Sequence, residues 1–151
     1  MSTNSLVTPH GGTLVNRIVD GPTAQKLTGE AAKLPVIILS AKQACDLEMI
    51  AIGAFSPLTG FMGQEDYEGT CWNMRLSDGT VWSIPITLAI NEKVKATLEV
   101  GGRAALKHAD GTLMAVITIS EIFPHDKKAH YHVFGTEDMA HPGVKAVADE
   151  G

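Results

Sequence analysis

An Asp-Gly pair between two runs of strand-forming residues constrains this sequence more than any other local feature. Residues 103–108 and 112–122 are rich in apolar residues, and Asp110 and Gly111 lie between them. Asp-Gly supplies the positive φ angles of a tight hairpin turn, so the pattern predicts two antiparallel strands. Residues 81–90 are predicted to form a further strand, with Pro85 placing it at a sheet edge or bulge. The middle of the chain is therefore expected to be β-rich.

Helical patterns precede and follow this part of the chain. Residues 35–39 form a compact apolar run, and Ser40 and Gln43 then follow in the spacing of a capping box. This arrangement predicts a buried strand leading into an amphipathic helix that ends at Gly53. The other predicted helices are a short one after Asp20, one over residues 64–74, one over residues 126–134 and one over residues 142–147. Together, the predicted helices and strands indicate a fold of the α+β class.

Length and charge narrow the class of protein. A chain of 151 residues is expected to form one domain with a sizeable core. The net charge of −5 disfavours a nucleic-acid partner, because such a protein has few cations with which to neutralise phosphates. We also expect no membrane partner, since glycine and proline interrupt the longest stretch without charge and no signal peptide is evident.

The two cysteines predict a reducing, cytoplasmic location. Cys45 and Cys71 have neither a Cys-x-x-Cys spacing nor neighbouring histidines. Reduced thiols of intracellular proteins have this pattern. Cys45 lies on the helix predicted after Ser40, without an obvious electropositive neighbour, and is expected to be a buried, unreactive thiol.

Familiar catalytic motifs are missing from the sequence. It has no Gly-x4-Gly-Lys phosphate loop, no Gly-x-Gly-x-x-Gly, no Gly-x-Ser-x-Gly and no His-Glu-x-x-His. Four histidines (His125, His130, His132 and His141) gather near the C-terminal end. On a helix His130 and His132 point about 200° apart, so they would not share one metal ion. Trp72 and Trp82 are interpreted as core anchors rather than as surfaces for a base. We assign neither catalytic nor metal-ligating residues.

A run of small and apolar residues at positions 54–62 does not fit a helical or strand period. Two phenylalanines, a leucine and a methionine stand there among serine, proline, threonine and glycine. A loop of this composition must be packed against something. An ordinary packed loop within the domain and a surface facing another domain explain it equally well.

Four blocks of sequence, in order, resemble the N-terminal part of the ATP sulfurylase (sulfate adenylyltransferase) family. The blocks are Leu6-Val7-x-Pro9-His10-Gly11-Gly12-x-Leu14-Val15-x-Arg17, then Asp46-Leu47-Glu48 with residues 53–62, then Trp82-Ser83-Ile84-Pro85-Ile86, and Thr136-x-Asp138-x-x-His141-Pro142-Gly143-Val144. They span almost the whole chain.

The resemblance implies a fold and a parent reaction. The implied fold over residues 1–151 is a PUA-like, mostly antiparallel β-barrel with flanking helices. The family joins sulfate to the adenylyl group of ATP, giving adenosine 5′-phosphosulfate and pyrophosphate, and uses ATP with Mg²⁺. Its catalytic domain carries Gln-x-Arg-Asn-x-x-His-x-x-His, which does not occur here. The chain therefore looks like the first domain alone, an excised or truncated piece that holds no cofactor and is expected to be inactive by itself.

The resemblance also implies where this chain meets its partner, the catalytic domain of the same enzyme, and it is compatible with a homo-oligomer of the parent. The residues assigned to a structural or interdomain surface are Pro9, His10, Gly11, Gly12, Phe55, Ser56, Pro57, Leu58, Thr59, Gly60, Phe61, Met62, His141, Pro142, Gly143 and Val144. An RNA-binding PUA-type module and a stand-alone interaction domain are the alternatives. The net negative charge of the chain argues against the RNA-binding module.

Overall fold

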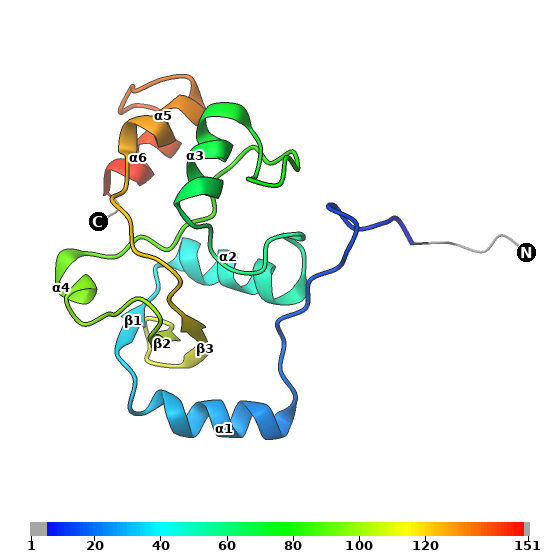
Figure 1. Ribbon diagram of the computed structural model, residues 1–151. Coiled ribbons are helices and arrows are strands. Elements are labelled where there is room, and N and C mark those ends of the chain that lie inside the picture. Colours follow the sequence, from blue (N-terminus) through cyan, green and yellow to red (C-terminus); the bar gives the residue numbers. More distant parts are fainter. Residues whose placement is uncertain (1–5, 150–151) are drawn as a thin grey trace, which may run out of the picture.

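A computed structural model describes residues 6–149 (Figure 1). In chain order its elements are α1 (Gly21–Ala31), β1 (Val36–Ile38), α2 (Ala41–Ile52), α3 (Gln64–Asn73), α4 (Glu92–Lys95), β2 (Arg103–Lys107), β3 (Leu113–Thr118), α5 (Lys127–Phe134) and α6 (Pro142–Asp149). In Figure 1, α3, α5 and α6 lie together at the top, α2 crosses the middle, and α1 lies at the bottom beyond the sheet.

The sheet contains three strands in the order β1-β2-β3. Strands β2 and β3 pair antiparallel, with Ala105 opposite Val116, and a register shift falls between Leu106 and Lys107. The hairpin predicted at Asp110 and Gly111 is thereby confirmed. Strand β1 pairs with β2 in parallel, with Val36 opposite Ala105. The sheet is mixed and open, so the predicted mostly antiparallel barrel is not confirmed, while the α+β class is.

The strand predicted over residues 81–90 is wrong. Only an isolated bridge between Arg75 and Val81 lies there, and the rest of the stretch is irregular. Its backbone is hydrogen-bonded to a loop and to a side chain instead. Ile86 C=O accepts from Met62 N–H at 2.8 Å, and Ala89 C=O accepts from Gln43 Nε2 at 2.8 Å. Pro85 has no N–H to donate, which removes one rung that a regular ladder would need.

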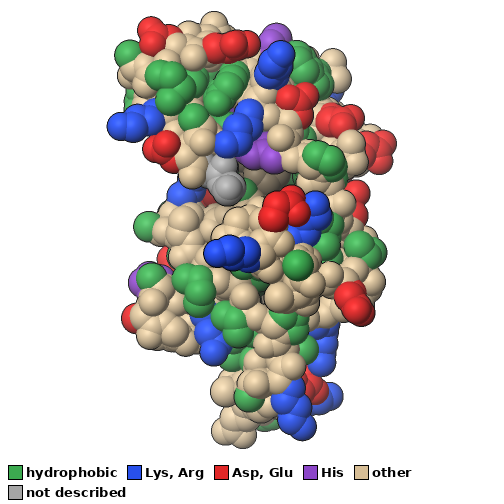
Figure 2. Space-filling model, turned by 90° about the vertical axis from the view of Figure 1, so that its left-hand side faces the viewer, with side chains coloured by type: hydrophobic (Ala, Val, Ile, Leu, Met, Phe, Trp, Pro, Cys, Tyr) green, Lys and Arg blue, Asp and Glu red, His purple; other side chains and the backbone are tan. Residues whose placement is uncertain are grey.

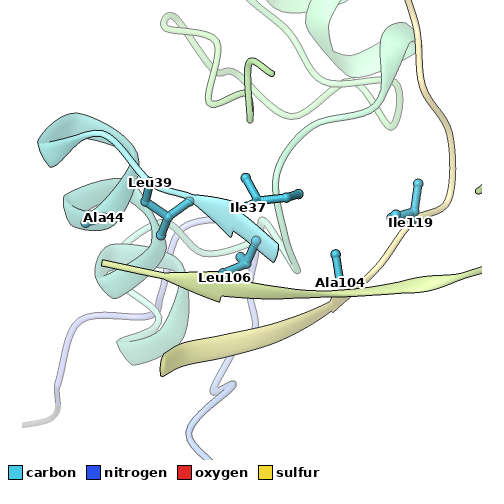
Figure 3. Packing of buried hydrophobic residues seen from close by; sticks show 6 residues of the cluster. All are labelled: Ile37, Leu39, Ala44, Ala104, Leu106 and Ile119. Atoms are coloured by element: carbon cyan, nitrogen blue, oxygen red, sulfur yellow. The ribbon is translucent and has the colours of Figure 1, made fainter. Parts of the chain in front are cut away.

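The main core lies between the sheet and α2. Its buried residues are Ile37, Leu39, Ala44, Ala104, Leu106 and Ile119. Figure 3 shows that Ile37 of β1 and Ala104 and Leu106 of β2 project from the same side of the sheet. Three successive residues of β2, Ala104, Ala105 and Leu106, are at most 1% exposed. Because successive side chains of a strand point to opposite faces, both faces of β2 are covered.

The capping box predicted for α2 is present. Ser40 Oγ accepts a hydrogen bond from Gln43 N–H, and Gln43 Oε1 accepts one from Ser40 N–H. The helix ends at Gly53, whose φ of 84° lies in the left-handed region that glycine adopts most easily. Both ends of α2 are thus determined by the local sequence.

Two side chains differ from their predicted burial. Trp72 was expected to anchor the core, but half of its surface is exposed, and its ring lies 4.7 Å from the ring of His132. Cys45 was expected to be buried and is exposed, whereas Cys71 is buried. Within α2, Ala44 and Asp46 are buried and Cys45 between them is turned outward, because neighbouring residues on a helix point about 100° apart.

Across residues 6–149, no helix has both the length and the apolar character needed to cross a membrane.

Candidate functional site

The first candidate segment is the turn at residues 9–12, in the N-terminal arm (residues 6–20). Gly12 N–H donates to Pro9 C=O at 2.9 Å, and Gly11 and Gly12 have φ angles of 73° and 89°. A Cβ at Gly11 would lie 2.7 Å from the ring of Pro57. The turn predicted here is confirmed, and Gly11 permits close contact with the loop at residues 55–62.

His10 strengthens this contact. Its Nε2 lies 2.8 Å from Val81 C=O, and its ring centroid lies 6.1 Å from that of Trp82. Phe55 meets Trp82 edge to face at 5.9 Å and 89°. Trp82 therefore stands between the turn and the loop, an arrangement that favours aromatic packing.

The loop at residues 55–62 is packed within the domain. Leu58 and Met62 are buried in a second cluster with Ile50, Leu76 and Ile86. Thr59 remains exposed at the surface. The interpretation as a packed loop describes its long apolar side chains, while its polar tip at Thr59 is exposed. A contact of this loop with another domain stays a prediction.

Three hydrogen bonds hold the arm on α2 and the loop, and a fourth, within the segment after α2, orients the Ser56 side chain. Ser56 Oγ, which is buried, accepts from Val15 N–H at 3.0 Å and donates to Gly53 C=O at 2.6 Å. Arg17 donates its N–H to Ala51 C=O and its Nε to Thr59 C=O, both at 2.9 Å. These bonds fix the geometry of the surface that the arm and the loop form together.

The third candidate segment, residues 141–144, lies elsewhere. Val144 is fully buried, and the ring of His141 packs on Phe134 at 5.1 Å. A Cβ at Gly143 would lie 2.7 Å from the Phe134 ring. In Figure 1, α5 and α6 lie at the upper left and the arm lies on the right. The structure thus brings together two of the three predicted segments, which we name the arm–loop surface (residues 9–12 and 55–62).

The four histidines near the C-terminal end have separate surroundings. His125 Nε2 lies 3.3 Å from Nδ1 of buried His130, whose ring stacks on Phe134. His132 contacts Trp72, and His141 contacts Phe134 from another side. In the described part of the chain, no three His, Cys, Asp or Glu side chains gather as a group that could hold a metal ion.

Burial perturbs two titratable groups near α3 and α5. Burial, followed by the nearby His125 and Lys42, lowers the pKa of His130 to about 4. Burial raises the pKa of the Cys71 thiol to about 11, with Asp126 and Glu68 adding to the effect. A neutral imidazole and a protonated thiol are thus favoured there, and the Cys71 thiol is not poised as a nucleophile at neutral pH.

Sequence reasoning assigned no functional role to Trp82 or Arg17 individually, although both stand in the blocks that carry the resemblance. Trp82 connects His10 to Phe55, and Arg17 connects the arm to the loop. Only their places in those blocks could have pointed to these roles, because the contacts join residues distant in sequence.

Comparison with known proteins agrees with this architecture. Residues 7–151 match the family model of the PUA-like domain, and the chain belongs to that family. A sulfate adenylyltransferase from Synechococcus sp. (strain JA-3-3Ab) is 44% identical over 146 residues, covering 96% of this chain and 37% of the relative. A probable bifunctional SAT/APS kinase 2 from Sorangium cellulosum (strain So ce56) is 46% identical, covering 97% of this chain and 25% of the relative.

A solved structure is also similar to this chain in fold and in sequence. The hexameric APS kinase from Thiobacillus denitrificans matches with a TM-score of 0.71 and 39% identity, covering 80% of this chain and 24% of that chain. The resemblance inferred from the four sequence blocks is confirmed, since proteins similar to this chain include sulfate adenylyltransferases. The chain spans 37% of the length of the sulfate adenylyltransferase from Synechococcus and about a quarter of the other two proteins.

Proposed function

We propose that this chain is the N-terminal support domain of a sulfate adenylyltransferase and that its partner is the catalytic domain of the same enzyme. The observation that carries the proposal is the 44% identity over nearly the whole chain to an enzyme of which the chain spans only 37%. The parent reaction joins ATP and sulfate to give adenosine 5′-phosphosulfate and pyrophosphate. We expect the parent to act in the cytoplasm and to form a homo-oligomer, as the name of the hexameric structural neighbour suggests.

We assign no residue of this chain to the Mg²⁺ and ATP of the parent reaction. Among residues 6–149, no group of three carboxylate, histidine or cysteine side chains could hold a metal ion. Transfer of an adenylyl group needs cationic stabilisation of the charge that develops at the phosphate. We therefore assign Mg²⁺, ATP and sulfate to the catalytic domain, and expect this chain alone to be inactive.

The arm–loop surface is our candidate for contact with the catalytic domain. It exposes His10 and Thr59, while the bonds of Ser56 and Arg17 hold its backbone in place. A preformed surface loses little conformational freedom on docking, which favours association. On the face shown in Figure 2, basic and acidic side chains are interspersed. This mixture does not favour the RNA-binding alternative, for which a basic stripe is typical.

The test is sulfate-dependent release of pyrophosphate from ATP and Mg²⁺. The 151-residue chain would be assayed alone, and then with a separately expressed catalytic domain of the sulfate adenylyltransferase from Synechococcus. We expect no turnover by the chain alone and higher or longer-lived activity of the catalytic domain on mixing. Turnover by the chain alone, or no effect on mixing, would contradict the proposal.

A matched pair of variants tests the surface itself. Thr59→Lys adds a charge to the exposed tip of the loop, and Gln25→Lys adds the same charge to exposed α1. Thr59→Lys should reduce the gain in activity on mixing, while Gln25→Lys should leave it unchanged. Equal effects of both substitutions would exclude the arm–loop surface as the contact.

A further inference from the structure

The helices α3, α5 and α6 form a unit with a small core of its own. The buried residues of this core are Tyr67, Cys71 and Ala129, and none of them belongs to the two larger clusters. In Figure 1 the three helices lie together above α2 and the sheet. Because α5 has only eight residues and few apolar side chains hold it on α3, this unit can open while the rest of the chain stays folded.

Two imidazoles contact each other within this unit. His130 of α5 is only 3% exposed, and its Nδ1 lies 3.3 Å from Nε2 of half-buried His125. In such a contact one nitrogen donates its proton and the other accepts it, so one of the two nitrogens must be unprotonated. When both rings carry a charge, two N–H groups face each other and the hydrogen bond is lost.

The pair connects α5 to both neighbouring helices. Tyr67 of α3 meets the rings of His125 and His130 nearly edge to face, with centroids 5.8 and 6.1 Å away. His130 also stacks on Phe134, which in turn contacts His141 just before α6. A displacement of the His130 ring would therefore loosen the packing of α3, α5 and α6 together.

The charged and titratable groups around His130 come from each element packed against α5. They are His125 before that helix, Lys42 and Asp46 of α2, Tyr67, Glu68 and Cys71 of α3, Asp126 at the start of α5, and His141 before α6. After burial itself, His125 and Lys42 lower the pKa of His130, because a positive charge on the ring would be repelled by both. Among residues 6–149, no carboxylate forms an ion pair with His130.

We propose that the contact between His125 and His130 is a pH-sensitive switch, which keeps α5 and α6 packed on α3 while His130 is neutral and releases them when His130 takes up a proton. In the closed form the imidazolium would be buried beside two cationic side chains, whereas in the open form water solvates it. Proton uptake and opening are thus coupled, and acid raises the population of the open form. This local conformational change is independent of the support role proposed above.

The thiol of Cys71 reports the opening, because it is buried in the same small core as Ala129 of α5. The test uses the 151-residue chain with Cys45→Ser and labels it with dithiodipyridine, which reacts with thiols in acid as well as at neutral pH. The labelling rate is divided by that of the urea-unfolded chain at the same pH. We expect this ratio to rise about tenfold from pH 7.5 to pH 5.5, because opening returns the pKa of His130 from about 4 to 6.5.

A matched pair of variants in the Cys45→Ser chain assigns the effect to one imidazole. His130→Phe retains a buried ring and removes the proton acceptor, so the labelling ratio should no longer depend on pH. His132→Gln removes an exposed imidazole from the same helix and should leave the tenfold rise unchanged. Equal rises in the two variants would overturn the proposal.

Two further measurements do not depend on the folding of His130→Phe. At pH 5.5 the labelling rate should stay constant as urea is added below the unfolding transition, since a local opening exposes little surface. By NMR, the imidazole nitrogens should show a neutral His130 in chains whose Cys71 is protected. A steep dependence on urea would mean that only global unfolding exposes Cys71. A charged His130 beside a protected Cys71 would mean that the closed form accepts the proton, and either result would refute the switch.

Discussion

The carboxylate of Glu121 accepts a hydrogen bond at 2.8 Å from the backbone N–H of Gln64, although 57 residues separate the two. Gln64 is the first residue of α3, and the N-cap residue Gly63 has no side chain to cap the helix. A Cβ at Gly63 would collide with Glu121 Oε1. A distant carboxylate thus takes the place of a local cap and ties α3 to the segment that follows β3.

Replacing this carboxylate should destabilise the domain. Glu121→Ala leaves an N-terminal N–H of α3 without its acceptor and removes a negative charge from the positive end of the helix dipole. We expect the free energy of unfolding, measured with urea, to fall by about 1 kcal/mol. Glu99→Ala, at another exposed glutamate, is the control and should change it by less than half as much. Equal losses would mean that the cap contributes nothing specific.

Gly53 should tolerate alanine less well than Gly79 does. Both have φ near 85°, at 84° and 87°. A Cβ at Gly53 would collide with Val15 C=O and approach Leu14, whereas a Cβ at Gly79 would meet nothing within 4 Å. We expect Gly79→Ala to cost about 1 kcal/mol and Gly53→Ala about 1 kcal/mol more, with faster proteolysis of the arm. Thermal unfolding measures the loss of stability in the two variants, and limited proteolysis measures the release of the arm. Equal losses of stability in Gly53→Ala and Gly79→Ala would show that the contact between Gly53 and the arm is unimportant.

The stability of the domain should decrease between pH 6.5 and pH 4. The pKa of His130 is lowered from 6.5 to about 4 in the folded chain, chiefly by burial and then by His125 and Lys42. As the pH falls through this window, the unfolded chain binds a proton that the folded chain does not, so the free energy of unfolding drops. Above pH 6.5 the contribution of neutral His130 to the free energy of unfolding is fully present.

Urea unfolding at pH 7.5, 6 and 5 provides the measurement for this group. His130→Phe retains a buried ring and removes the titrating group, so its stability should depend less on pH than that of the parent chain. A slope that is the same with and without the imidazole would assign the acid sensitivity to other residues.

The two thiols should differ strongly in reactivity. Cys45 is exposed and Cys71 is buried, and the pKa of Cys71 is raised to about 11. Because the thiolate is the reactive form, a disulfide reagent at pH 8 should modify Cys45 rapidly and Cys71 only after unfolding. Cys45→Ser should abolish the fast phase. A fast phase that persists in this variant would show that Cys71 is accessible in the folded chain.

Local signals predicted much of the fold. The Ser40 and Gln43 capping box, the stop at Gly53 and the Asp-Gly hairpin depend on residues adjacent in sequence, and each is present in the structure. The strand expected over residues 81–90 failed because its partners are distant: Met62, Met74 and Gln43 take its hydrogen-bonding groups one by one. Apolar character alone did not distinguish this irregular segment from a strand.

The candidate site was predicted only in part, because its contacts join residues that are distant in sequence. The sequence singled out the segments at residues 9–12 and 55–62, but their contact depends on Trp82, Pro57 and the hydrogen bond of Ser56 to Val15. The exposure of Cys45 was missed because one turn of α2 places it outside while its neighbours lie inside. Such orientation depends on which face of a helix the rest of the chain covers.

The parallel pairing of β1 with β2 has a consequence for the order of folding. The β2–β3 hairpin closes over a few residues, but β1 reaches β2 only after residues 39–102, with α2, α3 and α4, have been gathered between them. Loop-closure entropy makes such a distant contact slow to form. The hairpin should therefore be an early nucleus, and the docking of Val36 beside Ala105 a late event that completes the native chain topology.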